Sequence, residues 1–211
     1  MMTKILVSGF EKFGGESLNP TERLVHELNS CSIHVLTSRQ DLDVRGVVLP
    51  VEFGVAFDRL MQEVSVYRPE VILSLGLAAG RSEFELELLA HNHFQTGTGH
   101  TPVNRVEGVI LESGPGFLPT TLPAKAIREG CRQRGLTIRD SWSAGTYVCN
   151  DLFYRMQYRF RYTRLQSGFI HVPCVPEMAE RDGSLRPSMA FETQWKTLLA
   201  ILEALPRKAH G

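Results

Sequence analysis

Residues 4–8 read KILVS and residues 19–24 read NPTERL, and these two stretches decide the fold that we expect. The first is a short apolar run, which is typical of a buried strand. The second begins a helix, because Asn19 suits the N-cap, Pro20 the first helical position and Glu22 the acidic position of a capping box. A strand followed by a helix is the repeating unit of α/β proteins.

The same alternation continues along the chain. Further strands are predicted at residues 44–49, 70–75, 83–88, 137–140 and 168–172, and further helices at residues 55–67, 124–134, 147–159 and 189–205. This order predicts a mainly parallel sheet with helices on both faces. Residues 95–123, rich in Gly, Pro and Thr, form a predicted irregular segment that is long enough to be functional or an interface.

Composition limits the possible partners and compartments. The 211 residues, 43% of them hydrophobic, suit one domain over residues 1–211. Lys and Arg total 23 and Asp and Glu total 23, so neither nucleic acid nor a membrane surface is an expected partner. There is no apolar run of secretory or membrane-spanning length, and the four cysteines lack CxxC spacing. We therefore expect a reduced, cytoplasmic protein.

Cys149 and His171 are the candidate catalytic pair. Cys149 lies at the start of a predicted helix, where the helix dipole favours a thiolate, and His171 lies in the next predicted strand. The loops that follow parallel strands meet at one edge of a sheet, so residues 10–15 and 76–81 should converge there with both side chains. Taken alone, a buried cysteine or a core histidine is the commoner case. The pairing favours nucleophilic catalysis.

Three acids offer a partner for the histidine. Glu83, Glu85 and Glu87 alternate with apolar residues, so they share one face of a strand. This face is either solvated or contains one carboxylate that orients His171, and spacing does not choose among the three. His171 and Cys174 have a two-residue gap, but no second pair of metal ligands accompanies them, so no metal is predicted.

The loop after the first strand contains Phe10 and Phe13 beside several glycines. Two aromatic rings at the edge of the sheet suit a flat, uncharged ring as ligand. The glycines of residues 9–15 and 76–80 could also cradle a phosphate, although neither stretch matches a known phosphate-binding motif.

Five stretches, in this order, resemble the pyroglutamyl peptidase I (pyrrolidone-carboxylate peptidase) family of cysteine peptidases. They are ILVSGFEKFGGESLNPTERL (5–24), GLAAGRSEFELELLAHN (76–92), SAGTYVCN (143–150), GFIHVPCVPE (168–177) and PSM (187–189). The resemblance implies a three-layer α/β/α sandwich with a mainly parallel twisted sheet. It also implies a cytoplasmic enzyme, commonly a homotetramer, that acts on peptides with an N-terminal pyroglutamate and needs no cofactor.

The resemblance also implies roles for individual residues. Cys149 matches the family nucleophile, His171 its histidine and Glu87 its acid. The remaining matches concern the substrate: Phe10, Phe13 and Asn19 correspond to positions that hold the pyroglutamyl ring, and Arg81 corresponds to an arginine that we link to transition-state charge. The departures from the family pattern are Ala79 in place of proline, Leu88 in place of arginine, Trp142 in place of asparagine, and the whole stretch 93–109.

The expected reaction is attack of the Cys149 thiolate on the pyroglutamyl carbonyl, formation of a thioester and hydrolysis by water that His171 activates. Two alternatives remain open at this level. One is a nucleoside phosphorylase-like transferase, because glycine-rich loops can hold phosphate. The other is a member of the family that binds pyroglutamate without turnover, because of the changes at Leu88 and Trp142. The residue preferred after pyroglutamate is not encoded in these motifs.

Overall fold

The computed structural model describes residues 2–31, 37–96, 107–181 and 184–206. A central sheet of six strands has the order β2-β1-β3-β10-β4-β9. These strands are β1 (Thr3–Phe10), β2 (Leu42–Leu49), β3 (Val71–Leu77), β4 (Phe84–Glu87), β9 (Ile138–Ser141) and β10 (Gln166–Val172). Strands β2, β1, β3 and β10 are all parallel to one another, so the sheet is mainly parallel, as predicted.

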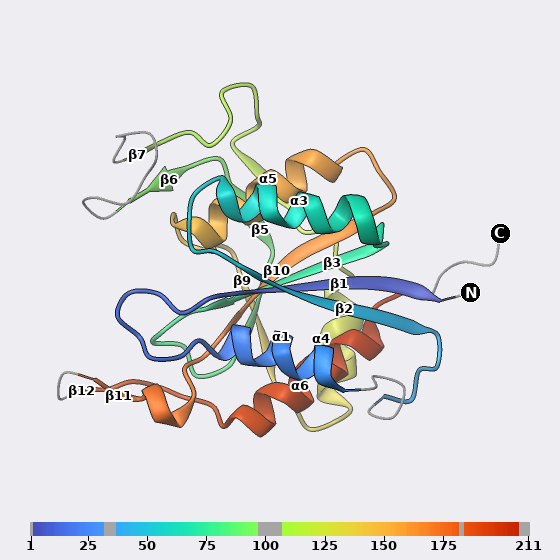
Figure 1. Ribbon diagram of the computed structural model, residues 1–211, viewed down its shortest axis with the longest axis vertical. Helices are drawn as coiled ribbons and strands as arrows, with labels where there is room; N and C mark the ends of the chain where they lie inside the picture. Colours follow the sequence, from blue (N-terminus) through green and yellow to red (C-terminus); the bar gives the residue numbers. More distant parts are fainter. Residues whose placement is uncertain (1, 32–36, 97–106, 182–183, 207–211) are drawn as a thin grey trace.

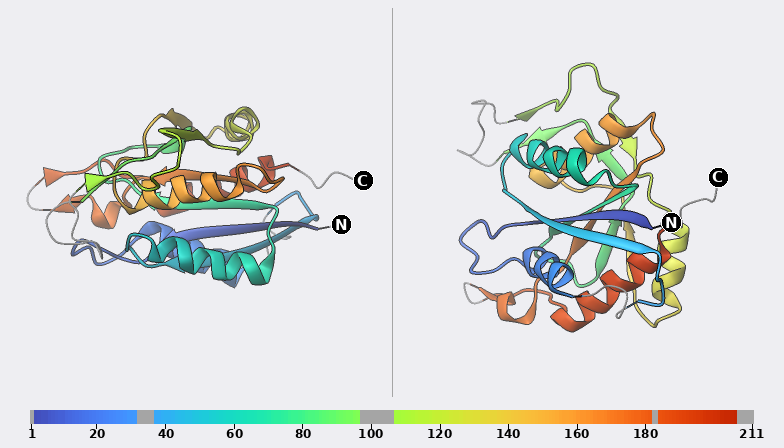
Figure 2. Two further views of the ribbon diagram at one scale, coloured as in Figure 1. Left: turned by 90° about the horizontal axis from the view of Figure 1, so that it is seen from above. Right: turned by 45° about the vertical axis from the view of Figure 1, so that its right-hand side comes forward.

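Helices cover both faces of this sheet (Figures 1 and 2). On one face lie α1 (Pro20–Ser30), α4 (Ala124–Arg132) and α6 (Phe191–Ala204), and on the other lie α3 (Val55–Tyr67) and α5 (Val148–Phe160). Side chains alternate between the two cores: Ile5 and Val7 pack on the α1 side, and Leu6 packs on the α5 side. The fold is the predicted α/β/α sandwich.

Short elements surround the sheet. They are β5 (Leu89–His91), β6 (Phe94–Gln95), β7 (Glu107–Gly108), β8 (Phe117–Pro119), the 3-10 turn η1 (Pro176–Met178), β11 (Glu180–Arg181) and β12 (Ser184–Leu185). β5 pairs with β8, and β6 with β7, so the segment predicted as irregular supplies strands to small two-stranded sheets whose partners begin just before it. Residues 97–106, the centre of the divergent stretch, lie outside the described residues.

The beginning of α1 confirms the predicted cap. Asn19 has extended backbone angles, and its side chain accepts a hydrogen bond of 3.0 Å from the Thr21 backbone N–H. Pro20 occupies the first helical turn, where a missing N–H costs nothing. Helix α4 ends at Arg132, two residues before the predicted end, and Gly135 with a φ of 67° completes the turn that follows it.

The direction of two strands differs from our expectation. β4 is antiparallel to β10, and β9 is parallel to β4, so β9 runs against the four core strands. The loop after β9 therefore does not begin at the edge where β1, β3 and β10 end. Residues 142–147 lead the chain back to that edge before α5 begins. Hydrophobic patterns predict that a strand exists but carry no information on its direction.

Within the described part of the chain, no helix is long and apolar enough to cross a bilayer.

Candidate active site

Cys149 lies in the first turn of α5. The helix begins at Val148, and Tyr147 precedes it with extended backbone angles and no side-chain cap. Gly145 has a φ of 77°, so it permits the sharp turn that directs the chain into the helix. The first backbone N–H groups of a helix have no acceptor within the helix and favour an anion. The start of α5 can therefore stabilise a thiolate or an oxyanion.

The sulfur of Cys149 lies over β3, beside His171. Gly76 of β3 is paired in register with His171 of β10, and a Cβ atom built on Gly76 would lie 2.9 Å from Cys149 Sγ. That Cβ would also lie 2.7 Å from the ring of Phe169, which shares a sheet face with His171. The sulfur and the imidazole are thus neighbours on one face, at the edge where β3 and β10 end.

His171 is oriented by Glu87. Its Nδ1 atom lies 2.6 Å from Glu87 Oε1, and both side chains are buried. With Nδ1 donating to this carboxylate, Nε2 remains available for the sulfur. Glu87 is opposite Phe169 and reaches His171 diagonally, whereas Glu85, directly opposite His171, forms an ion pair with Arg81. The spacing of the three acids left that choice open and the family resemblance implied Glu87, and Glu87 is the acid that contacts the histidine.

The other two acids contact arginines. Arg81 forms an ion pair with Glu85 through Nη1, and its Nη2 atom lies 3.8 Å from Glu87 Oε1. Glu83 accepts a hydrogen bond of 3.0 Å from Thr137 and lies 3.7 Å from Arg139. The predicted role of Arg81 in transition-state charge stays a prediction, and the contacts of its guanidinium are with carboxylates of β4.

Electrostatics at the sulfur oppose a free thiolate. Burial and the negative charge of Glu87 raise the pKa of the Cys149 thiol to about 12, and only a hydrogen bond from its own backbone N–H lowers it. Our expectation of a lowered pKa therefore requires His171 to take up the proton. The imidazolium formed then compensates the charge of Glu87 and places a cation beside the sulfur.

The residues expected to hold substrate occupy the loop after β1. Phe10 is buried, with its ring 6.4 Å from that of Phe169. Phe13 is half-buried and begins a turn that a hydrogen bond of 3.1 Å from the Glu16 N–H closes. Asn19 is buried, and besides capping α1 it donates to Glu11 O at 3.0 Å, which fixes the loop. Direct contact of these three with substrate stays a prediction.

Two residues near Cys149 have roles that the sequence did not predict. Gly76 provides the space for the sulfur. No sequence pattern predicts this role, because a glycine after a buried strand can serve many purposes. Asn150 is buried and joins α5 to the strand segment 91–93. Its amide accepts from His91 N at 3.0 Å and donates to the carbonyl oxygens of His91 and His93, each at 2.8 Å. The signal in the sequence was that Asn150 is a polar residue on a helix face that is otherwise apolar.

The departures from the family pattern lie around this site without entering it. Ala79 is exposed in the turn after β3. Leu88 is half-buried against the core on the α1 side, and its N–H donates to Ser141 O. Trp142 is 64% exposed, and its carbonyl oxygen lies 2.8 Å from His91 Nε2. None of these three side chains contacts the Glu87 and His171 pair in the interactions that the structure gives.

The four cysteines, Cys31, Cys131, Cys149 and Cys174, are free thiols. Among the described residues, no three or more His, Cys, Asp or Glu side chains are grouped so that they could hold a metal ion.

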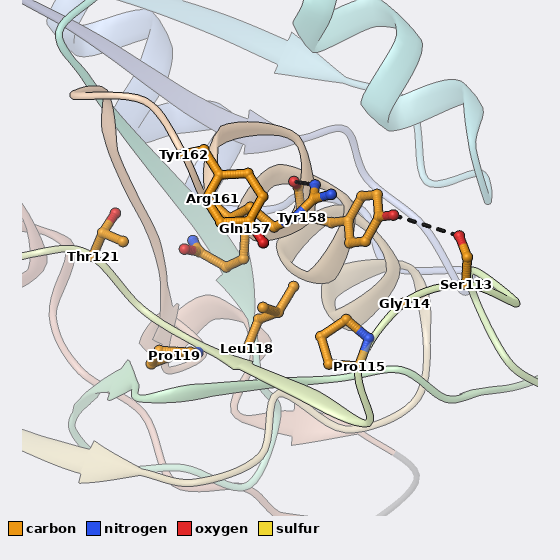
Figure 3. Close-up of a pocket in the computed structure, with 10 residues that line it drawn as sticks. All are labelled: Ser113, Gly114, Pro115, Leu118, Pro119, Thr121, Gln157, Tyr158, Arg161 and Tyr162. Carbon is orange, nitrogen blue, oxygen red and sulfur yellow. Dashed lines mark hydrogen bonds between the residues drawn. The ribbon is translucent and has the colours of Figure 1, made fainter.

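A separate pocket of about 670 Å³ lies between the end of α5 and the segment 113–121 (Figure 3). In it, the Arg161 guanidinium stacks on the Tyr158 ring at 3.7 Å, and the Tyr158 hydroxyl lies 3.4 Å from Ser113 Oγ. None of the predicted site residues lines this pocket. The pocket is therefore separate from the candidate catalytic residues.

The α/β/α sandwich and the grouping of Cys149, His171 and Glu87 are those expected of a cysteine peptidase. A family model described as pyroglutamyl peptidase matches residues 3–208. Pyrrolidone-carboxylate peptidase from Vibrio vulnificus is 37% identical over 196 residues, which cover 91% of this chain and 87% of that protein. The pyrrolidone-carboxylate peptidase of Pyrococcus furiosus is 35% identical over 207 residues, covering 95% and 96%.

Solved structures agree with these relatives. The crystal structure of pyroglutamyl peptidase I from Bacillus amyloliquefaciens is similar with a TM-score of 0.85, at 29% identity, over 97% of this chain and 96% of that one. The chain belongs to the pyroglutamyl peptidase family. The resemblance seen in the sequence motifs is thereby confirmed, and the comparisons give no support to a phosphorylase-like transferase.

Proposed function

We propose that this enzyme removes N-terminal pyroglutamate from peptides, with Cys149 as nucleophile, His171 as general base and acid, and Glu87 as the group that orients the imidazole. The observation that carries the proposal is the 2.6 Å contact between Glu87 and His171 beside the sulfur that rests over Gly76. Family membership supports the peptidase reaction.

The chemistry follows from this arrangement. His171 Nε2 takes the thiol proton, and the sulfur attacks the pyroglutamyl carbonyl carbon to give a tetrahedral oxyanion. The backbone N–H groups at the start of α5 are the candidate donors to that oxygen. His171 then protonates the leaving amine, and a thioester forms. Water that gives its proton to His171 cleaves the thioester and releases pyroglutamate.

Specificity is proposed to reside in the loop after β1. Pyroglutamate carries an uncharged lactam where other N-termini carry an ammonium group, and a site beside aromatic rings penalises the ammonium because it loses hydration. Phe13 is half-buried at the edge of the sheet, which supports contact with the lactam ring. Phe10 and Asn19 are buried, and Asn19 donates a hydrogen bond to Glu11 O in the loop, which supports a role in fixing its shape.

A hydrolysis assay tests the assignment. Wild type should release the fluorophore from a pyroglutamyl amide and leave a prolyl amide intact, because proline retains a charged amine. Cys149→Ser should lose at least about 1,000-fold in kcat/KM, because an alcohol in this position is a far weaker nucleophile. Equal activity of the variant would refute the role of Cys149, and binding of pyroglutamate without hydrolysis by wild type would favour the non-catalytic alternative.

We further infer that residues 1–211 form one domain, that the protein is cytoplasmic and that it assembles as a homotetramer. The position of β10 between β3 and β4 supports the single domain. This strand comes late in the chain and lies between two strands that come earlier, so both parts of the chain form one sheet. Four free thiols support a reducing compartment. The oligomer rests on the family resemblance. Light scattering after gel filtration tests the oligomer.

A further inference from the structure

Glu85 is placed where it can act on the catalytic pair without touching substrate. In the antiparallel pairing of β4 with β10 it stands directly opposite His171. Residues opposite each other in such a pair have Cβ atoms about 4.5–5.5 Å apart. The Glu85 side chain is only 18% exposed, so its charge is incompletely screened by solvent.

Arg81 is shared unequally between two carboxylates. It forms its ion pair with Glu85, whereas its closest contact with Glu87 is 3.8 Å, beyond hydrogen-bond distance. The second oxygen of Glu87, Oε2, is buried and has no hydrogen-bond partner among the described residues. An arginine can bind both oxygens of one carboxylate at once, so Glu85 competes with Glu87 for this guanidinium.

We propose that Glu85 is a positioning residue of the active site: by holding Arg81 it leaves the full charge of Glu87 to His171, and it thereby sets the pH range of activity. This inference rests on the proposed function of Cys149 and His171. It assigns Arg81 a second task, as the counter-charge that balances the carboxylates of β4.

Among the described residues, the strand register and the contacts place charged and titratable groups near His171 from β4, β9, α5 and the segment before β4. They are Glu85 and Glu87 of β4, Cys149 of α5, Arg81 of the segment between β3 and β4, and, beyond Glu85, Arg139 of β9. The neighbouring position in β3 is Gly76, which carries no charge. Arg139 lies 3.7 Å from Glu83, so that pair is nearly neutral.

The sign of the effect follows from proton counting. The active pair holds one proton between Cys149 and His171, and it becomes inactive when it gains a second proton or loses the first. Negative charge nearby retains protons, which moves both limbs of the pH profile to higher pH. Removing the charge of Glu85 and releasing Arg81 toward Glu87 both add positive potential, so both limbs should move to lower pH.

The test is the pH profile of Glu85→Gln. Both limbs should shift down by about half a pH unit at low salt, and less at high salt, as a partly screened unit charge predicts. Arg81→Gln should shift both limbs up, and the double variant should return toward wild type. The matched control is Glu83→Gln, on the same strand face but engaged by Thr137 and Arg139, which should leave the profile unchanged.

Two readouts separate this inference from the proposed function. One is kcat/KM on a pyroglutamyl amide, and the other is the rate of alkylation of Cys149 by iodoacetamide, which needs no turnover. Shifted alkylation profiles without hydrolysis would refute the proposed function and support the role of Glu85. Hydrolysis with profiles that coincide for wild type, Glu85→Gln and Arg81→Gln would overturn that role, whatever the loss of stability in the variants.

Discussion

Replacing Gly76 by alanine tests the position of the sulfur. The added Cβ would lie 2.9 Å from Cys149 Sγ, and 2.7 Å and 2.8 Å from two ring atoms of Phe169. Ordinary contact between such atoms is about 3.5–4.0 Å, so the sulfur must move by roughly 0.6–1.1 Å. A displacement of about 1 Å can cost roughly 100-fold in rate. We therefore expect kcat/KM to fall about 10- to 100-fold, together with about 1–3 kcal/mol of stability from overpacking.

Two glycines provide controls for this experiment. Gly116 has no atom within 4 Å of a built Cβ, so Gly116→Ala should change neither activity nor stability appreciably. A Cβ on Gly168 would meet Thr120 at 2.3 Å and Leu122 at 2.5 Å, away from the sulfur, so Gly168→Ala should destabilise the protein while the folded fraction keeps its activity. Wild-type kcat/KM in folded Gly76→Ala would refute the placement of Cys149 beside His171.

Three further predictions concern the surroundings of the pair. Asn150→Ala should lower the free energy of unfolding in urea by about 2–4 kcal/mol, since it removes three partly buried hydrogen bonds of a buried side chain. The exposed Asn29→Ala should cost under about 1 kcal/mol, and equal costs would contradict this. In His171→Ala, the burial and the Glu87 charge that raise the pKa of Cys149 to about 12 remain, so alkylation should increase steeply toward that pH. Reactivity at neutral pH like that of wild type would refute the role of His171 as proton acceptor. Glu16→Gln breaks the 2.9 Å ion pair with Arg186 that anchors the turn after Phe13. KM should therefore rise about 3- to 10-fold at nearly constant kcat, and a fall in kcat alone would argue against a role of this turn in substrate binding.

Local sequence signals predicted the elements that position the site. The cap at Asn19 and the apolar run of residues 4–8 fixed the first strand and helix, because both signals depend on neighbouring residues only. The pairing of Cys149 with His171 followed from the order of one helix and one strand. The first strand, the first helix and this pairing do not depend on the directions of β4 and β9.

Features that depend on register could not be predicted. The alternation of Glu83, Glu85 and Glu87 placed all three on one face without choosing among them. The family motif implied Glu87, and the contact of Glu87 with His171 crosses the β4–β10 pair diagonally. The reversed direction of β9 and the space above Gly76 likewise arise from contacts between distant segments. Such contacts leave no periodic trace in a single sequence.

The central claim is that Cys149 carries the pyroglutamyl group during turnover. The most direct measurement is mass spectrometry of wild-type enzyme quenched in acid while it hydrolyses a pyroglutamyl ester, with the peptide that contains Cys149 isolated and sequenced. We predict one pyroglutamyl acyl group on Cys149, lost on treatment with hydroxylamine as a thioester is, and none in Cys149→Ser. Turnover with the acyl group on another residue would contradict the account.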